Sequence, residues 1–128
     1  MSNEPTAKRP QLYNTTVALW DDTDDTLVNA TWTAGSGSLN CEGAKEVVVD
    51  IDYTHDTNNT SVKFIWDSVD DLDDGLSVIE REMSASLDGR IIIPVKGKVL
   101  TCKGYSDGGP GGSTALDVNA FAVFPPQY

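Results

Sequence analysis

The segment 45–67 reads KEVVVDIDYTHDTNNTSVKFIWD, and its alternation of apolar and polar residues decides the fold class. Successive side chains of a β-strand point to opposite faces of a sheet, so this period of two indicates strands with one buried face. Both runs are rich in the β-branched and aromatic residues that suit a pleated surface. The predicted buried side chains are Val47, Val49, Ile51 and Tyr53 in the first run and Val62, Phe64 and Trp66 in the second. The polar residues 55–59 tolerate turn geometry, so we predict a β-hairpin.

Similar short runs recur along the rest of the chain and are separated by turn residues. Further strands are predicted at 12–20, 26–33, 76–83, 91–95, 98–105 and 114–124. We expect the first two to form a hairpin across an acidic turn, a tight turn at Asp88-Gly89, and flexible loops at the Gly-rich segments 34–38 and 106–113. About eight regularly spaced strands and no convincing helix predict an all-β fold, specifically an antiparallel, jelly-roll-like β-sandwich.

The 128 residues suit a single domain. Residues 1–11 contain two prolines and no apolar periodicity, which predicts a flexible N-terminal arm in front of a sandwich domain at 12–128. No run approaches the roughly 20 apolar residues of a membrane span, and the first residues lack the apolar core of a signal peptide. We therefore expect synthesis in the cytoplasm.

The net charge of −11 arises from 20 acidic and 9 basic residues. A charge of this sign opposes non-specific binding to nucleic acid or to anionic membranes, so we expect neither as a partner. The arm departs from this trend with the segment Lys8-Arg9-Pro10. It is either a frayed terminus or an arm that contacts a neighbouring acidic subunit or a capsid surface.

Acidic residues gather in two predicted loops, 21–25 and 67–74. Calcium takes oxygen ligands from several carboxylates and carbonyls, so loops that meet at one end of the fold would offer a site. The candidate ligands are Asp22, Asp24, Asp70 and Asp73. The EF-hand spacing that ends in Gly75 is not met, because Leu72 and Arg81 occupy positions that need oxygen ligands. Solvated negative charge is the favoured interpretation, and we predict no cofactor.

No catalytic residue is predicted, and we do not expect an enzyme. His55 is the only histidine, and no Ser-His-Asp arrangement can be assembled around it. The segment 108–112 lacks the Lys-Ser/Thr pair of a phosphate-binding loop. Asp50 and Asp52 share one strand face, as a pair of glycosidase carboxylates would, but that face is most simply exposed to solvent.

Trp20, Trp32 and Trp66 either fill the core or form an aromatic sugar-binding face, and their strand context favours the core. Cys41 and Cys102 are far apart in the sequence and form no Cys-x-x-Cys motif. We expect both to be reduced, buried thiols, as is usual for a protein made in the cytosol.

The closing strand, 114–124, is apolar on both faces near its end. Phe121 and Val123 lie on the face opposite Leu116 and Val118. A two-layer sandwich covers only one face of each sheet, so the N-terminal arm or another subunit must cover these two side chains. The predicted subunit interface consists of Phe121, Val123, Pro125 and Pro126.

Residues 45–124 resemble a β-sandwich type common among bacteriophage virion proteins. The matching segments are KEVVVDIDYT (45–54), TSVKFIW (60–66), DGRIIIPVKGKVLTCKGYSDGG (88–109) and ALDVNAFAVF (115–124). In those proteins a pair of strands precedes an acidic or Trp-containing loop. A short turn like Pro94–Lys98 then leads to a strand, a Gly-rich tip and a closing alternating strand.

This resemblance implies a structural role without catalytic residues. It points to a capsid decoration (cement) subunit on the outside of an icosahedral head, with a head-fibre base or a tail accessory domain as related possibilities. Such proteins are commonly homotrimers, so the implied partners are other copies, the major capsid protein or another virion protein, and the implied location is the virion surface. The alternative function is a carbohydrate-binding module that uses an exposed Trp or Tyr and Asp or Asn side chains to bind a host-surface glycan.

Overall fold

The computed structural model describes residues 15–67, 76–109 and 114–125, and within these ranges it contains nine β-strands and no helix. The strands are β1 (Val17–Trp20), β2 (Thr33–Ala34), β3 (Leu39–Asn40), β4 (Glu46–Thr54), β5 (Thr60–Asp67), β6 (Leu76–Met83), β7 (Leu87–Pro94), β8 (Val99–Ser106) and β9 (Ala115–Val123). The all-β prediction is confirmed. No helix that could cross a membrane occurs in the described part of the chain.

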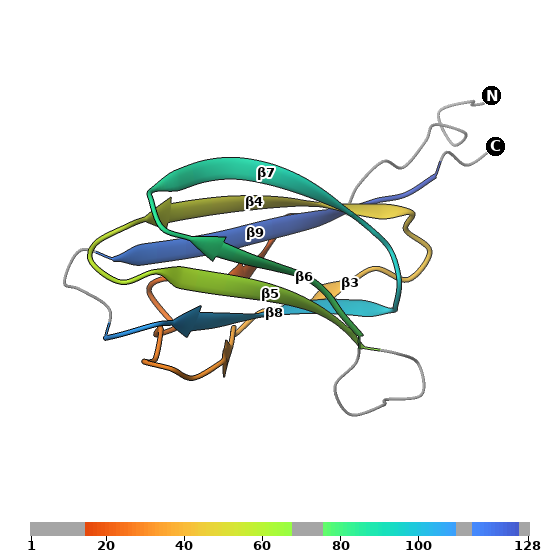
Figure 1. Cartoon of the computed structure of the whole chain (residues 1–128). Helices are drawn as coiled ribbons and strands as arrows, with labels where there is room; N and C mark the ends of the chain where they lie inside the picture. The colour runs from red at the N-terminus through yellow and green to blue at the C-terminus, as the bar shows by residue number, and fades with distance from the viewer. Residues whose placement is uncertain (1–14, 68–75, 110–113, 126–128) are drawn as a thin grey trace, which may run out of the picture.

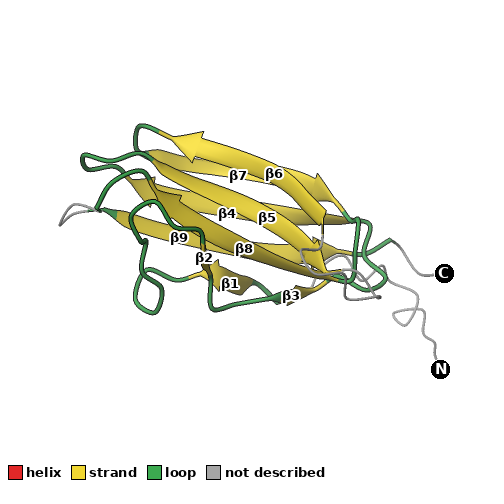
Figure 2. Ribbon diagram, turned by 60° about the horizontal axis from the view of Figure 1, so that its bottom comes forward, coloured by secondary structure: helices red, strands yellow, loops and turns green. Residues whose placement is uncertain are grey.

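The strands form two antiparallel sheets that lie face to face (Figure 1). The first sheet has the order β1-β9-β4-β7, and the second has the order β2-β8-β5-β6, with β3 also paired to β8. Figure 2 shows that the strands run along the two layers while the loops gather at their ends. The architecture is therefore β-sandwich-like.

The pairing is nested along the chain. β5 pairs with β6, β4 with β7, β2 and β3 with β8, and β1 with β9. The chain thus forms a long antiparallel ribbon that starts at the β5–β6 pair. The ribbon is rolled so that β4 also lies beside β9 and β5 beside β8.

The strands β4 and β5 were predicted correctly, but the hairpin between them is wrong. β4 pairs with β7 and β9, whereas β5 pairs with β6 and β8 in the other sheet. Residues 55–59 therefore cross between the layers. The alternation of apolar residues fixes which face is buried, but it is the same for a hairpin and for two strands that face each other across a core.

Two other predicted turns are also wrong. Segment 26–33 does not pair with β1, and of its residues only Thr33 belongs to a named strand, β2. Asp88 and Gly89 lie inside β7, opposite Asp52 and Ile51, because Asp-Gly is tolerated along an edge strand. The predicted strand 76–83 is confirmed as β6, and the Pro94-containing strand does lie at a sheet edge.

The core lies between the two sheets and is built from alternate residues of the long strands. The apolar faces predicted from the sequence are buried, together with Leu116, Val118, Ala120 and Ala122 of β9 and Leu100 and Cys102 of β8. Cys41 and Cys102 are both buried and free, as predicted.

The Gly-Ser segment 34–38 connects the two sheets, where the sequence predicted a flexible loop. The Gly35 N–H donates to the Cys102 carbonyl of β8 at 2.9 Å, and the Gly37 N–H donates to the Leu19 carbonyl of β1 at 3.3 Å. A Cβ atom on either glycine would overlap a β1 carbonyl oxygen, that of Leu19 for Gly35 and that of Ala18 for Gly37. The glycines are needed here for close backbone approach.

Candidate functional site

The outer face of the first sheet carries a row of apolar side chains, which we call the apolar row: Phe121 of β9, Val48 of β4 and Ile92 of β7. These residues are direct cross-strand partners. Val48 is not part of the core between the sheets yet is only 7 % exposed, whereas Ile92 is 57 % exposed. Val123 lies on the same face, one strand pair further along β9. Phe121 and Val123 therefore lie half-buried on the outer face, beside Val48 and Ile92, which sequence analysis missed.

A polar row borders the apolar row. Arg90 donates to the two carboxylate oxygens of Asp50 from Nε at 2.7 Å and from Nη2 at 3.1 Å. The guanidinium carbon also lies 5.9 Å from the centre of the Phe121 ring. The hydrogen bond from Arg90 lowers the pKa of the Asp50 carboxyl and raises the pKa of Arg90. This exposed pair contributes little to stability, but it fixes one boundary of the apolar row.

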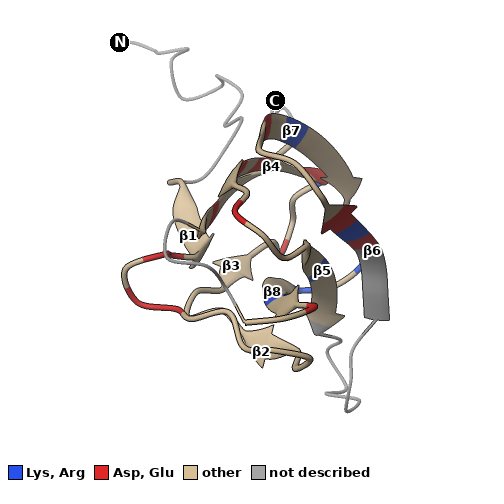
Figure 3. Ribbon diagram, turned by 60° about the vertical axis from the view of Figure 1, so that its left-hand side comes forward, with Lys and Arg blue, Asp and Glu red and all other residues tan. Residues whose placement is uncertain are grey.

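Three carboxylates follow on the same face, and we call them the acidic row: Asp117 of β9, Asp52 of β4 and Asp88 of β7. They are direct cross-strand partners. Like charges in this position repel each other. Figure 3 shows the acidic residues on β4 and β7 and in the loop that follows β1. The outer face therefore changes from apolar at one end to negative at the other.

The other predicted interface residues are only partly covered by the structure. Pro125 is exposed just beyond β9. Pro126 lies outside the described residues, as do the arm residues Lys8, Arg9 and Pro10.

The acidic turn 21–25 is held by its own carboxylates. Asp25 Oδ2 accepts hydrogen bonds from the Asp21 N–H at 2.9 Å, the Ser36 N–H at 3.1 Å and the Ser36 hydroxyl at 3.0 Å. Asp21 accepts from the N–H and hydroxyl of Thr23, and these bonds lower the pKa of Asp21. These two carboxylates therefore have a structural role in the turn.

The predicted calcium ligands are described only in part. Asp22 and Asp24 are exposed in the turn, whereas Asp70 and Asp73 lie outside the described residues. Among the residues with described positions, no group of three or more His, Cys, Asp or Glu side chains is placed to hold a metal ion.

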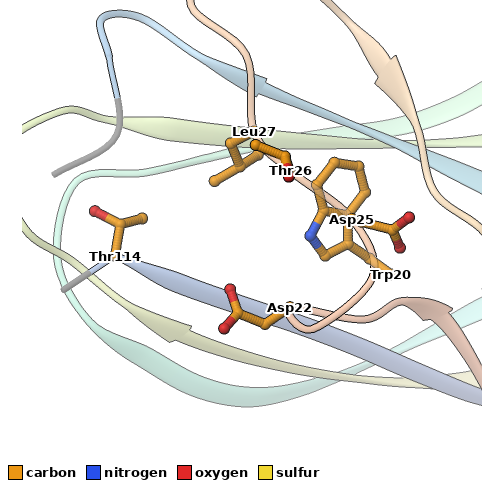
Figure 4. Close-up of a pocket in the computed structure, with 6 residues that line it drawn as sticks. All are labelled: Trp20, Asp22, Asp25, Thr26, Leu27 and Thr114. Carbon is orange, nitrogen blue, oxygen red and sulfur yellow. The ribbon is translucent and has the colours of Figure 1, made fainter. Parts of the chain in front are cut away.

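A pocket of about 180 Å³ opens between the acidic turn and the start of β9 (Figure 4). Its lining residues are Trp20, Asp22, Asp25, Thr26, Leu27 and Thr114. The Trp20 side chain is only 1 % exposed, and its indole nitrogen faces the space between Asp22 and Thr114. The Asp25 carboxylate points away, toward its partners on the other side of the turn. The pocket therefore combines one N–H donor, a carboxylate, a hydroxyl and apolar groups.

The position of Trp20 in this pocket depends on a glycine of the opposite sheet. A Cβ atom at Gly104 of β8 would lie 3.0 Å from Trp20 Cη2 and 2.9 Å from Leu27 Cδ2. The indole ring thus fills the space that a side chain at position 104 would need. The sequence shows no motif for this arrangement, because β1 and β8 are not neighbours in the chain.

The tryptophans divide between core and surface. Trp20 and Trp66 are 1 % exposed, which confirms the core prediction for both. Trp32 is half-buried on the outer face of the second sheet, so the core prediction is wrong for it. Its ring centre lies 5.0 Å from that of Tyr105, and Lys63 Nζ lies 4.2 Å above the ring. Because Thr33 pairs with the inward-facing Gly104, the preceding Trp32 must point outward.

Both thiols are protonated and therefore unreactive at neutral pH. Burial raises the pKa of the Cys41 thiol to about 11. Burial, followed by the nearby charge of Asp25, raises the pKa of Cys102 to about 12. The thiolate is the reactive form, so neither cysteine is a candidate nucleophile in the folded protein.

Because the pKa values of both thiols are raised in the folded protein, we expect the protein to lose stability at alkaline pH. Above about pH 9 the unfolded chain releases thiol protons that the folded protein retains, so the free energy of unfolding decreases as the pH rises toward about 11. The slope contributed by each thiol is at most ~1.4 kcal/mol per pH unit, and the full contribution is present below about pH 9. Urea unfolding of the wild type and of Cys102→Ala over this range should show a shallower pH dependence for the variant. Equal slopes would contradict the prediction.

No protein-family model matches the sequence, and no curated protein is similar enough to it to count as a match.

Proposed function

We propose that this protein is a non-enzymatic structural protein of a virus particle, a bacteriophage capsid decoration subunit that binds the outside of an icosahedral head. It assembles as a homotrimer and stabilises the shell through contacts between subunits and through its arm. The observation that carries the proposal is the apolar row, in which Ile92 is 57 % exposed on the edge strand β7. A strongly acidic protein gains nothing from such a row in water, whereas a neighbouring subunit would bury it.

The strand order supports the fold that this proposal needs. Nested pairing of a rolled ribbon into the orders β1-β9-β4-β7 and β2-β8-β5-β6 is what a single jelly-roll domain would have. Jelly rolls build many viral capsid domains, and they also build lectins, so the topology fits a shell component by analogy.

The charges suggest how the arm takes part. The acidic row places Asp117, Asp52 and Asp88 side by side, and their mutual repulsion would be relieved by cations. Lys8 and Arg9 are the basic residues of the otherwise uncharged segment 5–11. We propose that the arm of one copy binds the acidic row of the next, which would make assembly sensitive to salt.

The apolar row gives the decisive experiment. Replacing Ile92 with Asp places a charge in the row, so the trimer is expected to dissociate to monomers. The matched control is Val28→Asp, because Val28 is also exposed (41 %) but lies in the loop before β2. Light scattering behind size exclusion measures the mass of each variant, and circular dichroism confirms that each is folded.

Two results would contradict the proposal. One is an equal effect of Ile92→Asp and Val28→Asp on the mass and on binding to purified shells. The other is a wild-type protein that is monomeric and also fails to bind such shells.

A further inference from the structure

We infer that the pocket between the acidic turn and β9 binds the hydroxyl groups of a single sugar residue, such as the terminal residue of a glycan. This inference goes beyond the proposed assembly role and does not rest on it. The polar groups in its lining come from Trp20, Asp22 and Thr26.

The Trp20 indole N–H is a hydrogen-bond donor that faces the pocket. The side chain is 1 % exposed, and its nitrogen faces the pocket in Figure 4. It forms no hydrogen bond within the described part of the chain. Because this nitrogen lies at the surface of the pocket, water can reach it, and a ligand hydroxyl that accepts from it would take the place of that water.

The other side of the pocket offers acceptors. The Asp22 backbone N–H donates to Asp117 Oδ1 at 3.1 Å, which anchors this part of the turn. The Asp22 carboxylate lies across the space from the indole nitrogen, and the Thr26 hydroxyl lies between Leu27 and Trp20. An ionised carboxylate only accepts hydrogen bonds, whereas a hydroxyl can donate or accept.

This combination selects the ligand by its chemistry. An anion would meet the Asp22 carboxylate on a protein of net charge −11. An ammonium group would satisfy Asp22, but it has no lone pair to accept from Trp20. A purely apolar group would leave both polar groups unpaired. Hydroxyl groups donate and accept at once, and a sugar ring carries several of them together with C–H groups that suit Leu27 and the Thr114 methyl.

The size of the pocket agrees with one ring. Its volume is about 180 Å³, compared with ~30 Å³ for one water molecule in the liquid. An extended oligosaccharide would not fit inside, so further sugar residues would leave through the open side. The pocket is therefore suited to the end of a glycan.

The pocket also stays accessible in the proposed assembly. The turn that carries it is bonded to Asp117, four residues from Phe121 along β9, which corresponds to about 13 Å in a strand. Burial of the apolar row would leave the pocket open, whereas the arm proposed to bind the acidic row would reach Asp117 beside the pocket turn. Glycan binding is therefore measured separately from assembly, by the Trp20 resonance.

The Trp20 indole N–H resonance provides a direct measurement. Two-dimensional ¹H–¹⁵N NMR of the full chain is recorded during titration with methyl glycosides of neutral hexoses and N-acetylhexosamines, with acetamide and methylammonium as competing chemistries. We expect the Trp20 resonance to shift saturably with at least one glycoside, while those of Trp32 and Trp66 do not move. A Trp20 resonance that responds to no glycoside, or equally to acetamide, would overturn the inference.

A pair of variants tests the role of the carboxylate. Asp22→Ala removes the acceptor and is expected to weaken glycoside binding at least about tenfold, the usual value of a hydrogen bond to a charged group. Glu42→Ala removes the same charge from another exposed turn and should leave the affinity within about twofold. The next residue, Gly43, lies near Phe124 at the end of β9, whereas the pocket lies at the start of that strand. Equal affinities of the two variants would also overturn the inference.

Discussion

Replacing Gly37 with alanine is expected to destabilise the folded protein by about 3 kcal/mol or more. The new Cβ would overlap the Ala18 carbonyl oxygen, which belongs to the backbone of β1. A backbone atom cannot move aside as the end of a flexible side chain can, so either β1 or the segment 34–38 must be displaced. Displacement would break the Gly37 N–H bond to Leu19 and loosen the link between the two sheets.

Equilibrium unfolding in urea measures this effect, and Gly109→Ala is the matched control. A Cβ at Gly109 would have no heavy atom within 4 Å, and its φ is not positive. At such a position Gly→Ala commonly stabilises a protein by about 0.4–1 kcal/mol, because it restricts the unfolded chain. Opposite signs for the two substitutions are therefore expected. A similar, small effect at both positions would show that segment 34–38 does not hold the sheets together.

Replacing Trp20 with alanine is expected to cost about 3–5 kcal/mol. The indole is almost fully buried and packs against Leu27 and the bare backbone of Gly104, so its removal leaves a cavity between β1 and β8. Trp20→Phe keeps most of the ring volume and should cost clearly less. Both substitutions act where β1 faces β8 of the second sheet.

Trp32→Ala is the control for this prediction, because it deletes the same side chain from the outer face of the second sheet. Trp32 is half-buried and contacts Tyr105 and Lys63, so the expected loss is near 1 kcal/mol. Thermal or urea unfolding separates the two variants. Equal destabilisation by both would mean that the Trp20 ring is not an essential part of the core.

The sequence was sufficient to predict which residues face the core in the long strands. Val47, Val49 and Ile51 alternate with polar residues, and this local pattern is fixed by the geometry of a strand alone. It was not sufficient to predict the partners of the strands. The Asp88-Gly89 pair, for example, has the chemistry of a turn, yet it continues an edge strand because the flanking residues pair with β4.

Residues of the outer apolar face could be predicted only where the apolar pattern within a single strand revealed them. Phe121 and Val123 stand out because β9 is apolar on both faces, whereas Ile92 is hidden in a continuous apolar run. Its outward position follows from the register of β7 against β4, which is a tertiary property. The Trp20 pocket likewise requires residues from the β1 turn and the start of β9, which lie more than 90 positions apart.

The nested strand pairing also sets the order in which the protein can fold. β5 and β6 can pair early, because they follow each other in the sequence. β1 can pair only after β9, near the other end of the chain, has been made. Loop closure over such distances is slow, so we expect folding in the millisecond-to-second range typical of all-β domains. During synthesis on the ribosome, β1 therefore stays unpaired until almost the entire chain has emerged, and its apolar residues have to remain in solution for that whole period.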